Sequence, residues 1–222
     1  MTTLILTPLQ SELNFFLEGC HRLSIGTRDI VSGRLPAVEL AGGKAIVARG
    51  GTGKVQFAVH TQHLLDSGPD WDLLICAGAA GALADDLAIG DIVVAIDTVE
   101  HDYNNRFSQR PLPLFTGSVP FIDDLRRSVD PSWPFGVHFG RVASGDEDIV
   151  SEQRRRSLRR STNALVAAWE GAGGARAAAF NNVPFIEIRG VTDVADENAP
   201  SAFESNLSQT MKNIATLIVS WL

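Results

Sequence analysis

Apolar and polar residues follow one another along this chain with two different spacings. Short runs of aliphatic residues, such as 3–7 and 73–77, are typical of strands, whereas segments such as 10–17 carry apolar residues at helical spacing. Strands are expected at 3–7, 44–49, 73–77, 92–96, 137–143, 164–168 and 185–191, and helices at 10–17, 54–65, 170–180 and 203–221. Because strands alternate with helices, the sequence predicts an α/β fold. We expect one domain over residues 1–222, a three-layer α/β/α sandwich around a central, mostly parallel mixed sheet.

Two segments between these elements have the character of loops. Residues 78–81, Gly-Ala-Ala-Gly, predict a small-residue turn after the strand 73–77, where backbone can approach a ligand closely. Residues 102–120 contain two asparagines and three prolines with little periodicity, so we expect a long surface excursion. Such excursions often cover binding sites.

Composition and charge narrow the class of partner. With 45% hydrophobic and 20% charged residues the chain should fold into a globular core. Its net charge of −7 would repel a phosphate backbone, which argues against nucleic acid and for a small-molecule partner. The one basic run, Arg154–Arg156 with Arg159 and Arg160, is interpreted as a solvated helix face because no aromatic residue interleaves it.

The N-terminal residues and the cysteines indicate the cellular compartment of the protein. Residues 1–17 lack a basic start and Glu12 interrupts their apolar residues, so we predict neither a signal peptide nor a membrane span. Cys20 and Cys76 lie far apart without a CxxC pattern, which favours a reducing cytoplasm over a disulfide or zinc framework. No cofactor or metal is expected; His60 and His63 share a predicted helix face but lack a third ligand.

Generic nucleotide and hydrolase motifs fail on this chain. The segment 50–54, Gly-Gly-Thr-Gly-Lys, departs from a phosphate-binding P-loop at the first glycine position, occupied by Ala48, and at Val55 after the lysine. Neither a G-x-S-x-G elbow nor a G-x-G-x-x-G fingerprint occurs. The chemistry is therefore sought in carboxylates.

Four groups of residues, in order along nearly the whole chain, resemble the nucleoside phosphorylase and methylthioadenosine/S-adenosylhomocysteine nucleosidase superfamily. They are 7–12 (Thr-Pro-Leu-Gln-Ser-Glu), 51–54 (Gly-Thr-Gly-Lys), 77–83 continuing into 89–94, and a C-terminal group comprising 144–146, Glu170, 182–185, Arg189 and 192–196. The resemblance implies hydrolysis of the N-ribosidic bond of a purine-type nucleoside, with a 5′-modified one of the methylthioadenosine or S-adenosylhomocysteine kind as the first expectation.

The resemblance assigns the proton transfers to two carboxyl groups. Asp193, just past the predicted strand 185–191, resembles the acid that protonates the leaving base, which requires a pKa raised by burial. Glu12 occupies the family's position for the base that activates water. Without the resemblance, Glu12 would be an ordinary helix residue and Asp193 or Asp196 a turn or cap residue; Asp196 is interpreted as structural.

The resemblance also assigns binding residues. Glu170 resembles the glutamate that grips the ribose hydroxyls, and Arg189 resembles an arginine that orients the catalytic glutamate or the water. Phe203 matches an aromatic residue on the 5′ side of the nucleoside, or else belongs to a helix core. Gly81, like Gly78, either lets backbone approach the sugar or serves strand–helix packing.

The sequence departs from the family at positions that shape the pocket. Ala79 replaces a serine, so one hydroxyl near the sugar or water is missing. Asp148, next to Ile149, stands where the family has a phenylalanine stacked on the purine, and a charged side chain cannot supply that stack. Trp169 replaces the methionine before the ribose glutamate, and Ala168 replaces a glutamate. These changes leave the exact substrate open.

Three alternatives remain open beside this nucleosidase. Futalosine hydrolases share the scaffold, and a binding or storage protein would explain Ala79 and Asp148. A purine nucleoside phosphorylase is disfavoured because the arginine-bearing phosphate loop of that family has no equivalent and Glu12 would repel phosphate. The resemblance also implies a homo-oligomer, most simply a dimer, in which the excursion 102–120 either closes a neighbouring site or packs on its own chain.

Overall fold

The computed structural model describes residues 1–107 and 110–222, and the following elements are those of these two ranges. The strands are β1 (Thr3–Thr7), β2 (Thr27–Ser32), β3 (Leu35–Leu40), β4 (Ala45–Arg49), β5 (Leu73–Ala82), β6 (Ile92–Glu100), β7 (Leu114–Thr116), β8 (Val137–Ser144), β9 (Val166–Ala168) and β10 (Phe185–Asp193). The helices are α1 (Gln10–Arg22), α2 (Gly53–Ser67), α3 (Val119–Ser128), α4 (Glu152–Thr162), α5 (Gly171–Asn181) and α6 (Ala199–Trp221).

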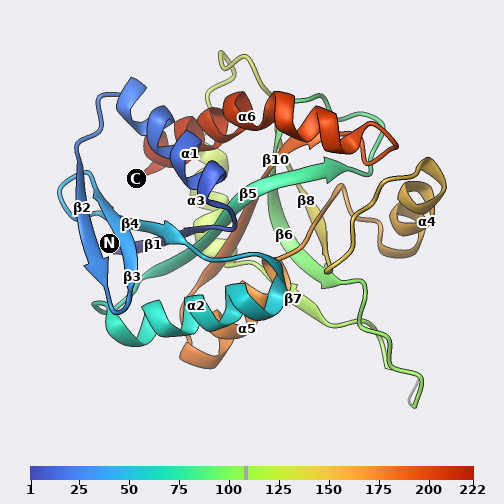
Figure 1. The fold of residues 1–222 in the computed structure, drawn as a ribbon, viewed down its shortest axis with the longest axis horizontal. Helices are drawn as coiled ribbons and strands as arrows, with labels where there is room; N and C mark the ends of the chain where they lie inside the picture. The colour runs from blue at the N-terminus through green and yellow to red at the C-terminus, as the bar shows by residue number, and fades with distance from the viewer. Residues whose placement is uncertain (108–109) are drawn as a thin grey trace.

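Helices cover both faces of a central mixed sheet (Figure 1). Buried residues of α1, α3 and α6 pack on one face, around Phe16, Leu125 and Met211. On the other face α2 and α5 pack together, around Phe57 and Ala178. Each helix layer removes one apolar face of the sheet from water, which stabilises the fold. The predicted α/β class and mixed sheet are confirmed.

The sheet is partly closed on itself. Its order is β10-β6-β8-β9-β5-β1-β4-β3-β2, and β10 also pairs with β5, so β5, β10, β6, β8 and β9 form a ring. Parallel pairing joins β4, β1, β5 and β10 and also β6, β8 and β9, while the β10–β6 and β5–β9 pairs that complete the ring are antiparallel. Small apolar side chains from all five strands pack together, among them Ala80, Val93, Val142, Val166 and Val191.

The predicted turn at residues 78–81 is wrong, because β5 continues through it to Ala82. Gly78 and Gly81 pair with Arg189 and Asp193 of the parallel strand β10. A Cβ on Gly78 would lie 2.9 Å from the Arg189 guanidinium, and one on Gly81 would lie 2.8 Å from the Asp193 carboxylate. The small residues therefore make room for side chains of β10 instead of ending the strand.

Two further segments differ from the expectation, whereas the basic run forms a helix, as expected. The hairpin β2–β3 was not predicted, since its residues are mostly exposed or half-buried and carry no clear apolar alternation. The excursion 102–120 contains β7, which pairs with β6, and the start of α3, where Pro120 occupies the first turn; residues 108–109 of that prediction lie outside the described residues. The basic run forms α4, whose Arg154, Arg155 and Arg156 each pair with an acid.

Within the described ranges, no helix combines the length and apolar character needed to cross a membrane.

Candidate active site

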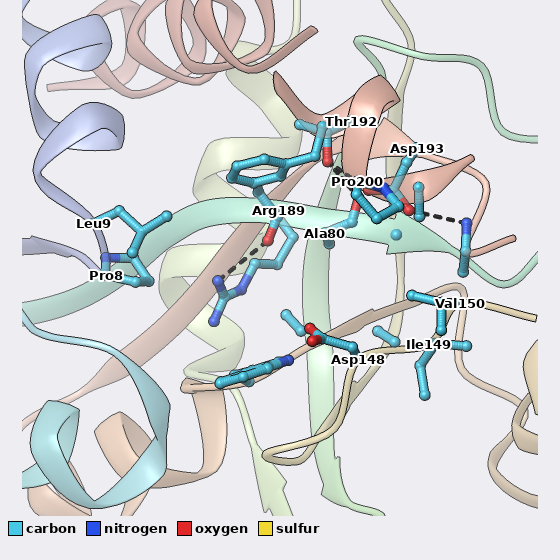
Figure 2. Close-up of a pocket in the computed structure, with 18 of the residues that line it drawn as sticks. Pro8, Leu9, Ala80, Asp148, Ile149, Val150, Arg189, Thr192, Asp193 and Pro200 are labelled. Atoms are coloured by element: carbon cyan, nitrogen blue, oxygen red, sulfur yellow. Dashed lines mark hydrogen bonds between the residues drawn. The ribbon is translucent and has the colours of Figure 1, made fainter. Parts of the chain in front are cut away.

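One cavity of about 440 Å³ opens where β1, β5, β8, β9 and β10 end (Figure 2). Open α/β sheets commonly place ligands at the carboxyl ends of their strands. All ten site residues predicted from the sequence line this cavity: Glu12, Ala79, Gly81, Asp148, Ile149, Trp169, Glu170, Arg189, Asp193 and Phe203. The topology thus brings together residues that lie up to 191 positions apart in the chain, because Glu12 is the first and Phe203 the last of the ten.

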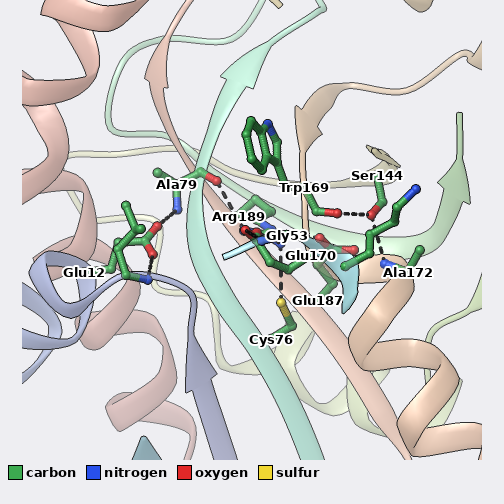
Figure 3. Close-up of polar contacts among 12 residues, drawn as sticks. Glu12, Gly53, Cys76, Ala79, Ser144, Trp169, Glu170, Ala172, Glu187 and Arg189 are labelled. Carbon is green, nitrogen blue, oxygen red and sulfur yellow. Dashed lines mark hydrogen bonds and ion pairs between the residues drawn. The ribbon is translucent and has the colours of Figure 1, made fainter. Parts of the chain in front are cut away.

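Glu12 is held by two backbone amides (Figure 3). Because it is the third residue of α1, its side chain turns back to the helix N-terminus, where one oxygen accepts the N–H of Leu9 at 2.7 Å. The other oxygen accepts the N–H of Ala79 on β5 at 2.8 Å. Burial, reinforced by the nearby charge of Glu170, raises the pKa of Glu12 to about 7, although both amides oppose this shift. Near neutral pH this carboxyl group can exchange a proton.

Arg189 spans the interior between β10 and the cavity, with its side chain only 1% exposed. Its Nη2 donates to Glu170 at 3.3 Å and to the sulfur of Cys76 at 3.4 Å, and its Nη1 donates to the carbonyl of Ala79 at 3.4 Å (Figure 3). Its Nε donates to Glu187 at 2.8 Å. The guanidinium is therefore fixed at all three nitrogens.

Glu170 occupies the N-cap position of α5, without a side-chain capping bond, and is 4% exposed. One oxygen accepts the N–H of Gly53 at the start of α2, at 3.1 Å, and the other accepts from Arg189. Burial raises the pKa of Glu170, and the charge of Arg189 counteracts this. Glu170 thus reaches the cavity from the side opposite α1.

Asp193 ends β10 and is 7% exposed. Its Oδ2 accepts the hydroxyl of Thr192 at 2.8 Å, and its Oδ1 accepts the N–H of Ala195 at 2.9 Å. Burial raises the pKa of Asp193 despite these two bonds. By contrast, Asp196 accepts the N–H of Asn198 ahead of α6, as expected of a structural residue.

The remaining wall combines apolar and acidic side chains. The indole of Trp169 donates to the carbonyl of Glu147 at 3.1 Å, which ties the segment after β8 to the end of β9. Asp148 and Ile149 lie on that segment and face the cavity (Figure 2). Phe203 lines it from α6.

Carboxyl groups outnumber cations in this wall. Six of the described lining residues are acidic, namely Glu12, Glu147, Asp148, Glu170, Asp193 and Glu204, whereas Arg189 is the one described cation among them. Glu147 is neutralised by Arg154 through two bonds of 2.7 Å. Such a wall suits a neutral ligand on which positive charge develops.

Within residues 1–107 and 110–222, no three His, Cys, Asp or Glu side chains are grouped to hold a metal ion. His63 instead accepts the backbone N–H of Arg34 at 2.7 Å.

Sequence reasoning missed residues that support the site from behind. Glu187 lies two residues before Arg189 on the same face of β10, a spacing that pairs side chains along a strand. Ser144 accepts the N–H of Ala172 and donates to the carbonyl of Trp169, so it joins β8 to the start of α5. Ser144 and Thr192 belong to the motif segments 144–146 and 192–196, but the sequence alone assigns neither a role; Thr192 donates to Asp193.

Comparison with known proteins gives consistent similarities. Residues 2–222 match the family model described as phosphorylase superfamily. A 5′-methylthioadenosine/S-adenosylhomocysteine nucleosidase of Tolumonas auensis is 32% identical over 192 residues, covering 83% of either chain. The structure of the nucleosidase of that name from Neisseria meningitidis, in complex with methylthio-immucillin-A, has a TM-score of 0.85 and 27% identity, covering 99% of this chain and 97% of that one. Futalosine hydrolase of Helicobacter pylori has the same fold, with a TM-score of 0.88 and 24% identity over 100% of this chain and 97% of that one.

Proposed function

Because this chain belongs to the phosphorylase superfamily, we propose that its cavity hydrolyses the N-ribosidic bond of a purine-type nucleoside, with 5′-methylthioadenosine and S-adenosylhomocysteine as the first substrates. The observation that carries this proposal is the placing of Glu12 and Asp193, two buried carboxyl groups with raised pKa values, in one cavity. Two of the similar proteins are 5′-methylthioadenosine/S-adenosylhomocysteine nucleosidases, which supports this choice of substrates.

Asp193 acts as the acid. Departure of the base leaves electrons on the purine, and a proton delivered to N7 lets the base leave uncharged. Burial keeps Asp193 protonated at higher pH than an exposed aspartate, while Thr192 and Ala195 fix the orientation of its carboxyl group.

Glu12 acts as the base. With a pKa of about 7 it is largely ionised just above neutral pH and still basic enough to take a proton from water. The water oxygen forms the new bond to C1′ as the bond to the purine breaks, so the products are the free base and the free sugar.

Glu170 and Arg189 bind and orient. Glu170 would hold the ribose hydroxyls, and its charge favours the positive character that the sugar acquires as the bond breaks. Arg189 and Glu12 approach each other next to Gly78, because a Cβ placed on Gly78 would lie 2.9 Å from Nη1 of Arg189 and 2.9 Å from Oε1 of Glu12. Arg189 would therefore orient a water between itself and Glu12.

Water is a better nucleophile than phosphate for this cavity. Phosphate sites use cations and amides, often several arginines. Arg189 already pairs with Glu170 and Glu187, and the described wall otherwise presents acids to a phosphate ion.

Trp169, Asp148, Ile149 and Phe203 line the cavity and would contact the base and the 5′ group of the substrate. Asp148 and Ile149 would face the base, Ala79 and Gly81 would lie along the sugar, and Phe203 would lie on the 5′ side. Futalosine is the alternative substrate, in line with the fold shared with futalosine hydrolase.

We also propose that the chain, as one domain over 1–222, forms a homodimer in the cytoplasm. Val55 and Val59 are exposed on the outer face of α2, and Tyr103, Phe107 and Leu114 are exposed on the excursion. Exposed apolar groups of this kind mark protein contacts. Cys20 and Cys76 are free and buried, as a reducing compartment allows. Light scattering on the wild type and on Val55→Glu tests the dimer; a monomeric wild type would contradict it.

The deciding assay measures base release from methylthioadenosine, S-adenosylhomocysteine, adenosine, inosine and futalosine, with and without phosphate. Release without phosphate supports the hydrolase and identifies its substrate. Release that requires phosphate would make it a phosphorylase, and binding without release would make it a binding protein.

A further inference from the structure

A second carboxylate lies behind Arg189, outside the cavity wall. Glu187 is fully buried between β10, β6 and the start of α5. Its Oε1 accepts Nε of Arg189 at 2.8 Å, and its Oε2 accepts the hydroxyl of Thr98 on β6. At the start of α5, a Cβ on Gly171 would overlap the carboxylate, so the absence of a side chain there leaves the space that Glu187 fills.

Three features stabilise a negative charge in this buried place. Arg189 forms an ion pair with Glu187, and Thr98 donates a hydroxyl. The first turn of α5 also directs its amide dipoles toward groups at its N-terminus. Removing a buried partner of an ion pair is costly, so this arrangement requires that Arg189 and Glu187 stay together.

The positive charge of Arg189 therefore interacts with more than one carboxyl group. Glu187 contacts it from behind and Glu170 from the cavity, and Glu12 feels its field across the site. Cys76 also contacts the guanidinium, but burial raises the pKa of its thiol well above the usual value, so it adds no charge at neutral pH.

We propose, on the basis of the function proposed above, that Glu187 is a positioning residue for the reaction. Its carboxylate fixes the guanidinium of Arg189 from behind and offsets its charge, so that Glu12 stays basic enough to take a proton from water.

The electrostatic consequence has a definite sign. The groups that act on Glu12 are Arg189 from β10, Glu170 from the start of α5, and the amides of Leu9 and Ala79. Arg189 lowers the pKa of Glu12 and Glu170 raises it. Without the charge of Glu187, the field of Arg189 would be offset by Glu170 alone and would lower the pKa of Glu12 further.

The test is the pH dependence of kcat/KM for methylthioadenosine in the wild type and in Glu187→Gln, which keeps the shape and an acceptor oxygen for Arg189, while its NH2 group can donate to the hydroxyl of Thr98. We expect the acid limb of the profile to move to lower pH by about half a unit to one unit, and kcat at pH 7.5 to fall about threefold to tenfold with KM within about twofold. The control Thr98→Val removes a hydroxyl and leaves the charge, so its acid limb should coincide with that of the wild type.

A wild-type acid limb in Glu187→Gln would overturn the inference, as would an equal displacement in Thr98→Val. Should the glutamine variant fail to fold, Glu187→Asp decides the matter: it keeps the charge and lengthens the contact, so a reduced kcat at an unchanged acid limb supports the positioning role and a wild-type kcat refutes it. A wild type that releases no base from any nucleoside would contradict the proposed function itself, whereas a wild-type profile in the variants contradicts only the inference about Glu187.

Discussion

The carboxylate of Glu12 accepts the backbone N–H of Ala79 at 2.8 Å, although 67 positions separate the two residues. The bond joins the first turn of α1 to β5 at the point where Arg189 donates to the carbonyl of the same Ala79. The backbone of Ala79 therefore sets the distance between Glu12, the proposed base, and the guanidinium of Arg189.

Glu12→Gln should abolish most hydrolysis. The amide is nearly the same size but takes no proton from water, so kcat should fall by about 10² to 10⁴-fold while nucleoside binding persists. Base release and calorimetric binding of methylthioadenosine measure the two effects. Glu18→Gln, on the same helix, is the matched control: the Glu18 side chain is exposed, pairs with the mostly buried Lys212 and does not line the cavity, so this variant should keep full activity. Wild-type kcat in Glu12→Gln would exclude its role as base.

The same carboxyl group should make stability depend on pH. Since the folded-state pKa of Glu12 is raised from 4.5 to about 7, the folded state holds its proton where the unfolded state has lost it. Stability contributed by the protonated group is therefore present below about pH 4.5 and is lost as pH rises through about 7. Glu12→Gln removes this dependence, so relative to the wild type it should gain about 1 to 3 kcal/mol in unfolding free energy between pH 4.5 and pH 8. Urea unfolding at both pH values measures the gain, and parallel curves for the two proteins would contradict it.

Asp193→Asn should remove the proton donor while keeping the hydrogen-bonding shape. We expect kcat to fall by about 10² to 10⁴-fold with a small change in KM, because the loss concerns the departing base. Asp196→Asn is the control: this side chain accepts the N–H of Asn198, which an asparagine oxygen can also do, and its charge is only a minor cause of the raised pKa of Asp193. Full activity in Asp193→Asn, or equal losses in both variants, would disprove the assignment.

Gly81→Ala should displace the carboxyl group of Asp193 without changing its chemistry. Its Cβ would lie 2.8 Å from Oδ1 of Asp193 and 3.1 Å from Cβ of Ala195, so one of them has to move. We expect at least a tenfold loss in kcat, in line with the cost of misplacing a catalytic group, and a destabilisation of about 1 to 3 kcal/mol. Gly26→Ala, where no atom lies within 4 Å of the new Cβ, should leave both activity and unfolding unchanged. Kinetics and thermal unfolding of the pair provide the comparison.

Much of the site's assembly follows from local sequence. Glu12 comes shortly after β1, Glu170 follows β9, and Asp193 ends β10; all three strands carry short apolar runs that were predicted. Because ligands gather where the strands of an α/β sheet end, Asp193 was expected at such an end, whereas Glu12 and Glu170 were assigned to the site by the resemblance. The assignment of roles, however, came from the resemblance, since spacing alone does not distinguish an acid from a helix cap.

The unpredicted parts depend on contacts between distant segments. Residues 78–81 have the composition of a turn, but the side chains of Arg189 and Asp193 occupy the space that larger residues would need. Glu187 shares one face of β10 with Arg189, but its bond to Thr98 arises only when β6 and β10 lie side by side. Local propensity carries no information about either relationship.

Asp148 is the residue whose replacement should change substrate use. It lies in the cavity wall at the position where the resemblance places an aromatic residue against the purine (Figure 2). Asp148→Phe should lower KM for methylthioadenosine about twofold to tenfold, because stacking contributes about 0.5 to 1.5 kcal/mol. Asp148→Ala separates the two causes, since it removes the charge without adding a ring and should therefore gain less.

Steady-state kinetics of both variants on methylthioadenosine, inosine and futalosine show whether the gain follows the base or the 5′ group. A gain shared by methylthioadenosine and inosine places Asp148 beside the base. A higher KM for every nucleoside in Asp148→Phe would instead mean that the carboxylate itself contacts the substrate, and that this cavity binds its purine without a stacked ring.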